Sequence, residues 1–147
     1  MLLAAAAFTA AAAQSSHEDG VPARKSSIEC TETADASARV CAVDTATYVG
    51  WRVYHAQCAD CHGADALGSS FAPNLTLRMR GMTSREFFAA LDRGYMGPND
   101  PAPPRGRNPN VARYYNELWA YLAARVSGEL PVATLDRLSG GDERTPD

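Results

Sequence analysis

The run Cys58-Ala59-Asp60-Cys61-His62 constrains this chain more than any other feature of its sequence. Two thiols with two residues between them, and an imidazole directly after the second, can bind one group together. The chain has 147 residues, which suggests a single domain, and its core is small once the two ends are set aside. An apolar group held at this run would therefore add greatly to the core.

The spacing of this run is the attachment signature of a c-type haem. Cys58 and Cys61 can form thioether bonds with the two vinyl groups of one haem, and His62 is then placed to bind iron from the proximal side. A thioredoxin-type redox pair would need a preceding strand, and the sequence has no strand signal. A zinc site would need two more ligands, and the spacing of Cys30 and Cys41 is not that of a zinc finger or ribbon. We therefore predict one covalent haem c.

The two remaining cysteines, Cys30 and Cys41, have ten residues between them. In an oxidising compartment such a pair can close a disulfide. Closing a loop of this size would stabilise the fold by about 2–3 kcal/mol. Two free thiols are the alternative.

An Ala-rich apolar run, Leu2–Ala13, opens the sequence. It is too short to span a membrane. Its length and its small residues at Ala11-Ala12-Ala13 are typical of a signal-peptide core and cleavage site, although no Lys or Arg precedes Arg24. We predict export to the periplasm, with no stable insertion in the membrane.

Charge is unevenly distributed along the chain. The formal net charge is −3, so nothing global indicates nucleic-acid binding. The segment Phe71–Tyr115 carries seven arginines and a net charge of +4, whereas Gln14–Thr47 and Ser127–Asp147 each carry −3. The basic segment is either an ordinary solvated surface or a basic face around a redox centre, for docking or for pairing with haem propionates.

Capping signals predict where the first two helices begin. The first starts at Asp44 or Thr45, either of which can serve as N-cap, and runs into Cys58. The second starts with a capping box, in which Thr83 and Glu86 each satisfy a backbone donor of the other.

The last helix is predicted to begin at Asn108, with Pro109 at its first position, and to end at Gly128. Residues 63–80 and 95–106 are predicted as loops because of their Gly and Pro content. Because no strand signal of any length is found, the predicted class is all-α, with about three to four helices wrapped around one haem.

The flanks of the motif resemble class I cytochrome c. Gly50, Tyr54 and Cys58 reproduce that family's Gly, aromatic and Cys spacing at intervals of four. Leu118 and Tyr121 match the facing pair on its C-terminal helix. The resemblance implies that the glycine lets the last helix cross closely, with the aromatic beside it.

The resemblance also implies a partner for the proximal ligand. Pro73 follows His62 by eleven residues, near the family's proline whose carbonyl accepts the ring N–H of the proximal histidine. Such a bond fixes the tautomer and makes the imidazole a better donor to iron.

A closer resemblance is to the cytochrome c-L type electron acceptors of quinoprotein methanol and other alcohol dehydrogenases. It rests on Tyr48–His55, on Gly68–Pro73 and on Asn108–Val111 with the helix that follows. It implies a periplasmic electron carrier rather than an enzyme. Its donor would be a pyrroloquinoline-quinone dehydrogenase, calcium- or lanthanide-dependent, and its acceptor a downstream cytochrome or oxidase.

The distal iron ligand departs from the family pattern. Related cytochromes place a Met before a Pro shortly upstream of the last helix, and the matching stretch, Asp100–Pro104, has none. We predict Met96, thirty-four residues after His62, as the distal ligand, with Met82 and Met79 as alternatives. Iron without a Met ligand is the remaining case.

These interpretations divide the chain into four segments. Residues 1–13 are predicted as signal-peptide-like, 14–43 as an extended N-terminal leg, 44–130 as the cytochrome c domain and 131–147 as a flexible acidic tail. Two other functions stay open: a five-coordinate haem protein that binds or senses small ligands, and a haem subunit of a larger dehydrogenase complex.

Overall fold

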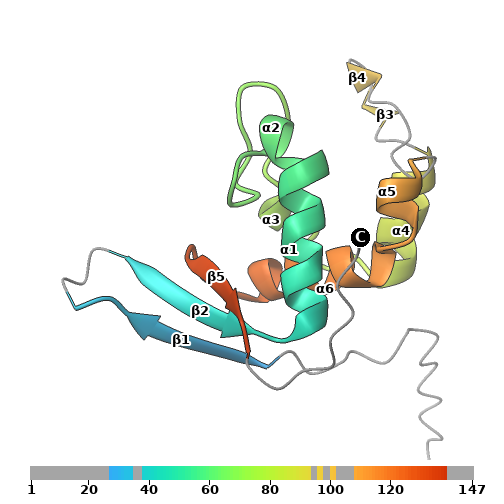
Figure 1. Cartoon of the computed structure of the whole chain (residues 1–147). Coiled ribbons are helices and arrows are strands. Elements are labelled where there is room, and N and C mark those ends of the chain that lie inside the picture. The colour runs from blue at the N-terminus through green and yellow to red at the C-terminus, as the bar shows by residue number, and fades with distance from the viewer. Residues whose placement is uncertain (1–26, 35–37, 94–95, 98–99, 102–107, 139–147) are drawn as a thin grey trace, which may run out of the picture.

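The computed structural model describes residues 27–34, 38–93, 96–97, 100–101 and 108–138. The helices are α1 (Thr45–Gln57), α2 (Ala59–His62), α3 (Leu75–Arg78), α4 (Ser84–Arg93), α5 (Pro109–Ala112) and α6 (Tyr115–Ser127) (Figure 1). The strands are β1 (Ile28–Glu32), β2 (Arg39–Val43), β3 (Met96–Gly97), β4 (Asp100–Pro101) and β5 (Thr134–Arg137). Within this part of the chain, no helix has the length and apolarity needed to cross a membrane. The signal-peptide-like segment, 1–13, lies outside the described residues.

Helix α1 begins at the predicted cap and ends at the motif. The side chain of Asp44 accepts a hydrogen bond from the backbone N–H of Thr47 at 3.0 Å and another from its hydroxyl at 2.9 Å. At the other end, the N–H of Cys58 donates to the carbonyl of Tyr54 at 2.8 Å. The helix therefore delivers the chain directly to the first cysteine of the motif.

Helix α4 begins at the predicted capping box. The N–H of Thr83 donates to the carboxylate of Glu86 at 2.8 Å, and the N–H of Glu86 donates to the hydroxyl of Thr83 at 3.3 Å. The bonds that Thr83 donates, from its backbone first, lower the pKa of Glu86. The reciprocal pair satisfies two backbone donors that would otherwise lack partners at the start of the helix.

The last helix is interrupted, which differs from the prediction of one helix between Asn108 and Gly128. Asn108 does cap α5, where its side chain accepts from the N–H of Asn110 at 2.9 Å. The backbone then leaves helical geometry at Tyr114, with φ −122 and ψ 25, before α6 begins. Gly128, at φ 83, ends α6 as predicted, because a left-handed residue stops the helix.

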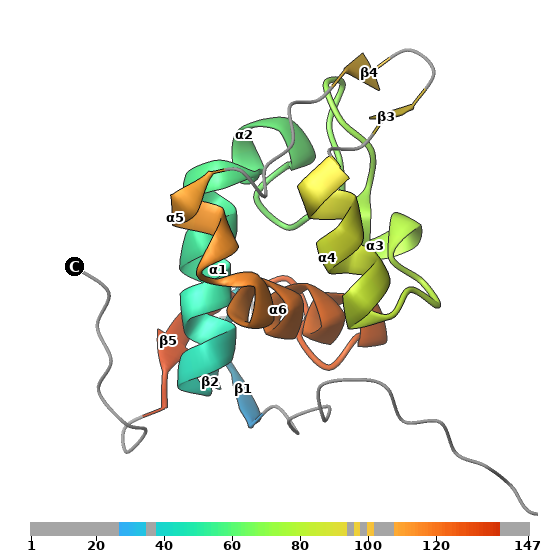
Figure 2. The same cartoon turned by 90° about the vertical axis from the view of Figure 1, so that its right-hand side faces the viewer.

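Helices α1 and α6 form the centre of the core. A Cβ added at Gly50 would lie 1.9 Å from the carbonyl oxygen of Glu117, so only glycine permits this approach. Beside the crossing, the buried rings of Tyr54 and Tyr121 lie 5.3 Å apart. Helix α6 also contacts α4 (Figure 2). The crossing that the cytochrome c resemblance implies is therefore present.

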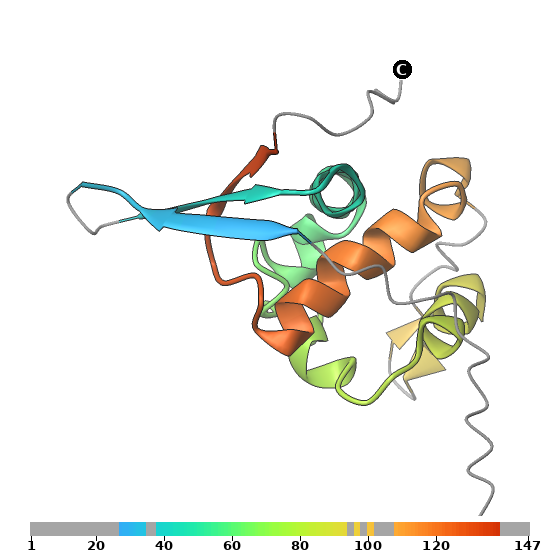
Figure 3. The same ribbon diagram turned by 90° about the horizontal axis from the view of Figure 1, so that it is seen from below.

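A three-stranded sheet corrects the prediction of an all-α class. Strand β1 pairs with β2 in antiparallel fashion, and β2 pairs with β5 in parallel fashion, with Cys41 opposite Leu135. Figure 3 shows the β1–β2 hairpin projecting away from the helices. Strands β1 and β2 lie within the segment predicted as an extended leg, and β5 lies within the segment predicted as an acidic tail.

The sheet was not predicted, because the apolar alternation in its strands is short and because β2 pairs with β5, which lies far along the chain. In β2 only Cys41 and Val43 are buried, and in β5 only Leu135. Two or three alternating apolar residues do not distinguish a strand from an irregular segment. Their partners across the sheet, which stabilise them, lie at the other end of the chain.

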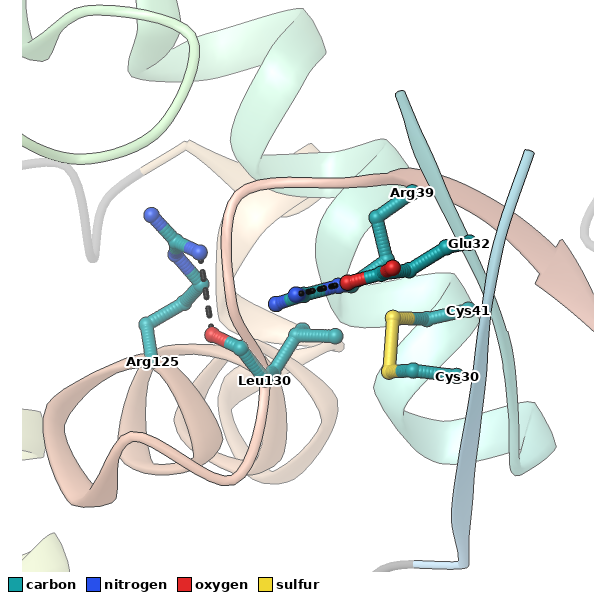
Figure 4. The surroundings of a disulfide bond; sticks show 6 residues. All are labelled: Cys30, Glu32, Arg39, Cys41, Arg125 and Leu130. Carbon is teal, nitrogen blue, oxygen red and sulfur yellow. Dashed lines mark hydrogen bonds and ion pairs between the residues drawn. A yellow bond between two sulfur atoms is a disulfide. The ribbon is translucent and has the colours of Figure 1, made fainter. Parts of the chain in front are cut away.

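The disulfide between Cys30 and Cys41 joins directly opposite residues of β1 and β2 (Figure 4). Replacing both cysteines by alanine is expected to lower the free energy of unfolding by about 2–3 kcal/mol, because the unfolded chain gains the entropy that the closed loop removes. Denaturant unfolding of the two haem-bearing proteins, followed by circular dichroism, would measure the difference.

The matched control is the exposed ion pair beside the disulfide, in which Arg39 and Glu32 lie 3.0 Å apart (Figure 4). Glu32→Gln should cost less than about 1 kcal/mol, because exposed ion pairs contribute little. Equal unfolding midpoints for the wild type and the double cysteine variant would contradict the stabilising role of the disulfide.

Candidate functional site

The motif folds as a single helical turn directly after α1. Cys58 is both the C-cap of α1 and the N-cap of α2. Its carbonyl accepts hydrogen bonds from the backbone N–H of Cys61 at 3.2 Å and from that of His62 at 2.9 Å. Residues three apart on a helical turn lie on the same side, so the two cysteines have neighbouring positions. Neither belongs to a disulfide; Cys58 is half-buried and Cys61 is exposed.

The imidazole of His62 is held by the carbonyl of Pro73. The distance from Nδ1 to the Pro73 oxygen is 2.9 Å. A carbonyl can only accept, so this contact places the proton on Nδ1 and leaves the lone pair of Nε2 for a metal. The contact that the family resemblance implies is therefore present, and it is the arrangement of a metal-binding histidine with an oriented ring.

The loop between His62 and Pro73 is fixed by backbone contacts. The N–H of Gly68 donates to the carbonyl of His62 at 2.8 Å. Gly68 has φ +88, and an added Cβ would lie 2.7 Å from the nitrogen of Asn74, so the turn requires glycine. This tight turn returns the chain so that Pro73 faces the imidazole.

One side chain fastens the loop to α1, and another ties the loop to the motif. The hydroxyl of Tyr54 donates to the carbonyl of Gly63. Burial is the main reason that the pKa of Tyr54 is raised above its usual value, so the phenol keeps its proton and remains a donor. The hydroxyl of Ser69 donates to the carbonyl of Cys61 and accepts from the N–H of Phe71. The role of Ser69 was not predicted, because a lone serine in a loop gives no specific signal.

The three methionines considered as distal ligand occupy different places. Met79 is 4% exposed and belongs to the hydrophobic core. Met82 is partly buried and packs against that core. The backbone of Met96 belongs to β3, which pairs with β4 so that Met96 is opposite Pro101. The side chain of Met96 lies outside the part of the chain that the structure describes.

The surroundings of the motif suit a large apolar ligand such as haem. Among the described residues the large apolar side chains that stand exposed include Leu67, Phe71 and Leu77, at 52%, 79% and 54%. All three lie in the loop after His62 or in α3. Two cysteines outside disulfides, an oriented imidazole and exposed apolar side chains close to them in the chain fit the attachment of a haem.

Five arginines of the basic segment, Phe71–Tyr115, stand exposed in the structure. Those of the described residues are Arg78, Arg80, Arg85, Arg93 and Arg113. The other two arginines of the basic segment, Arg105 and Arg107, lie outside the described residues. Arg78 lies in α3, and Arg85 and Arg93 lie in α4, where Glu86 and Asp92 are exposed as well.

Comparison with known proteins places the chain in a family. The family model described as "Cytochrome C oxidase, cbb3-type, subunit III" matches residues 46–122. Cytochrome c-553I of Paracoccus denitrificans is 40% identical over 94 residues, which span 61% of this chain and 42% of that protein. Cytochrome c-555 of Methylococcus capsulatus (Bath) is 32% identical over 96 residues, which span 65% of this chain and 75% of that protein.

A solved structure shares the fold. The c-type cytochrome XoxG from Methylobacterium extorquens AM1 superposes with a TM-score of 0.60 at 39% identity, covering 71% of this chain and 63% of that one. The chain therefore spans less than half of cytochrome c-553I and less than two thirds of XoxG. The predicted cytochrome c fold is confirmed, with the small sheet as an addition. This chain belongs to the c-type cytochromes, in the family described as cbb3-type cytochrome c oxidase subunit III, and these are electron-transfer proteins rather than enzymes.

Proposed function

We propose that this chain is an exported electron carrier with one haem, attached through Cys58 and Cys61 and ligated by His62 and Met96. The observation that carries the proposal is the 2.9 Å contact between His62 Nδ1 and the carbonyl of Pro73, next to two cysteines outside disulfides. A bound haem would supply one reversible electron through the Fe(III)/Fe(II) couple. The residues of this chain anchor it, orient the proximal imidazole and surround it with apolar side chains.

Export is supported by the disulfide. The bond between Cys30 and Cys41 joins β1 to β2. Disulfides persist in oxidising compartments such as the bacterial periplasm and are rare in the cytosol. Together with the signal-peptide-like segment, 1–13, this supports a periplasmic location.

For the electron donor we propose a quinoprotein alcohol or methanol dehydrogenase, and for the acceptor a downstream cytochrome or oxidase. The support is the sequence resemblance to cytochromes of that type, together with the 39% identity to the c-type cytochrome XoxG. The test is to mix the oxidised protein with a purified quinoprotein dehydrogenase and its alcohol, and to follow reduction by visible absorption. If the protein is a soluble monomer and the dehydrogenase reduces it at catalytic rates, that result would argue against a fixed subunit of a larger complex.

Met96→Ala is expected to abolish the weak near-red absorption band that sulfur bound to ferric iron produces. It should also lower the reduction potential, because a Met ligand raises it. Met79→Leu and Met82→Leu are the matched controls, since Leu replaces Met in a core at a cost below about 1.5 kcal/mol, and both should keep the band. The readout is the visible spectrum of each oxidised protein.

A ligand-binding haem protein is the second candidate, because no Met precedes a Pro in Asp100–Pro104. If the wild type lacks the near-red band and its reduced form binds carbon monoxide readily, the iron has an open position. That result would contradict Met96 as ligand and would favour the ligand-binding function.

A further inference from the structure

Arg125 is the one charged side chain that the structure buries among the residues it describes. It lies near the end of α6 and is 9% exposed. Arginine is almost never buried unless it is paired with a carboxylate or phosphate. An arginine buried in the core of a small electron carrier therefore calls for an explanation.

Among the described residues, the hydrogen bonds of the Arg125 guanidinium go to backbone carbonyls. Nη1 donates to the carbonyl of Leu130 at 2.9 Å, and Nη2 donates to the carbonyl of Asp65 at 2.9 Å (Figure 4 shows the first bond). Nε is buried and has no partner among the described residues, and none of their carboxylates forms an ion pair with Arg125. The adjacent cavity of about 10 Å³ has room for about one water. The guanidinium is therefore largely removed from bulk water, and Asp65, whose negative charge acts on Tyr121 as the positive charge of Arg125 does, lines the same cavity.

The bond to Asp65 fastens the loop that follows the proximal histidine. Asp65 comes three residues after His62, and the next residue, Ala66, accepts a hydrogen bond from the N–H of Leu75 at 2.9 Å. The N–H of Gly68 closes the same loop on the carbonyl of His62 at 2.8 Å. Arg125 therefore ties α6 to the loop that brings Pro73 to the imidazole.

The charge of Arg125 also reaches the interface between α1 and α6. Burial raises the pKa of Tyr121 to about 12; the positive charge of Arg125 opposes this rise, and the negative charge of Asp65 adds to it. The ring of Tyr121 lies 5.3 Å from that of Tyr54, whose hydroxyl holds the carbonyl of Gly63 just after His62. The field of a buried charge is weakly screened inside a protein.

We propose that Arg125 is a positioning residue that locks the loop after His62 and that its buried positive charge raises the reduction potential of the haem. The proposal rests on the haem attachment argued under the proposed function. Ferric iron carries one more positive charge than ferrous iron, so a nearby buried cation destabilises the oxidised protein more than the reduced one. Removing the charge should therefore make the protein harder to reduce.

The test is the midpoint potential of the purified haem-bearing protein, measured by redox titration with visible absorption. In Arg125→Met the ratio of reduced to oxidised protein at a fixed ambient potential should fall about tenfold, equal to about 59 mV for one electron. Arg125→Lys keeps the charge and should stay within about twofold of the wild type. The matched control is Arg85→Met, at an exposed position of α4, which should also stay within about twofold, because solvent screens an exposed charge.

The positioning of the loop after His62 by Arg125 is tested separately, by amide hydrogen exchange. The amide hydrogen of Gly68, which donates to His62, should exchange about tenfold faster in Arg125→Met than in the wild type. Should Arg125→Met fail to mature with haem, Arg125→Gln, which keeps an N–H donor but no charge, is titrated in its place with the same expectation.

Two results would overturn the proposal. The first is a neutral variant with the potential of the wild type, and the second is an Arg125→Lys variant whose potential falls as far as that of Arg125→Met. A wild type that carries no covalent haem would instead refute the proposed function. The two failures are therefore distinguishable from one set of purified proteins.

Discussion

Replacing Cys58 and Cys61 together by alanine is expected to leave the chain without covalently bound haem. No thiol then remains at the motif to form a thioether bond, while the imidazole of His62 and its contact with Pro73 are untouched. In cells that carry a cytochrome c maturation system, the wild type should retain haem on a denaturing gel stained for peroxidase activity. The double variant should retain none.

The chain offers a matched control, because its other two cysteines form a separate pair. Cys30→Ala with Cys41→Ala removes the disulfide between β1 and β2 but leaves the motif intact. That variant should be less stable and should still carry covalent haem. Haem that stays bound through denaturation in the Cys58 and Cys61 variant would contradict the assignment of the attachment site.

Loss of haem should also weaken the fold itself. The chain is short, and Leu67, Phe71 and Leu77 stand exposed after the motif. Each large apolar side chain that is removed from water contributes about 1.5–3 kcal/mol. The haem-free double variant is therefore expected to unfold at a lower denaturant concentration than the wild type, as circular dichroism would show.

Replacing Gly50 by alanine is expected to destabilise the protein by about 3 kcal/mol, at the upper end of the usual cost of overpacking. At a solvent-exposed position inside a helix, replacing glycine by alanine would stabilise by about 1 kcal/mol, so the expected effect at Gly50 has the opposite sign. The added Cβ would lie 1.9 Å from the carbonyl oxygen of Glu117 and 3.0 Å from Cβ of Tyr121. The first contact is backbone of α6, which cannot rotate away, so α1 and α6 would have to move apart.

Guanidinium unfolding of the haem-bearing proteins would measure this change. Gly81→Ala is the control, because nothing lies within 4 Å of an added Cβ there and the backbone has φ +74. It should cost only the strain of a left-handed residue, about 1–2 kcal/mol. A Gly50→Ala protein at least as stable as the wild type would show that the helices do not approach as closely as the structure has them.

The helix starts and the proximal contact follow from residues close together in the chain. Asp44 caps α1 through Thr47, three residues away, and Thr83 caps α4 through Glu86, also three residues away. A partner this near lies within reach whatever the rest of the chain does, so the pattern suffices to predict it. The contact between His62 and Pro73 spans a short loop and was implied by family resemblance.

Other features could not be read from the sequence. The interruption at Tyr114 divides a stretch whose apolar period continues from α5 into α6, so periodicity alone predicts one helix. Arg125 looks like an ordinary last-turn arginine, and only the distant carbonyl of Asp65 reveals its burial and its role. The partners of both features depend on how separate segments pack.

By itself the sequence determined the caps of α1 and α4 and predicted a haem-attachment motif at Cys58–His62. Each of these depends on residue types at short, fixed spacings, whose geometry is set by local backbone sterics and hydrogen bonding. Only the tertiary structure decided that β2 pairs with β5 and that Arg125 holds the loop after His62. Those contacts join residues far apart in the chain, and they form only where the packing of the whole fold repays the entropy of closing the segments between them.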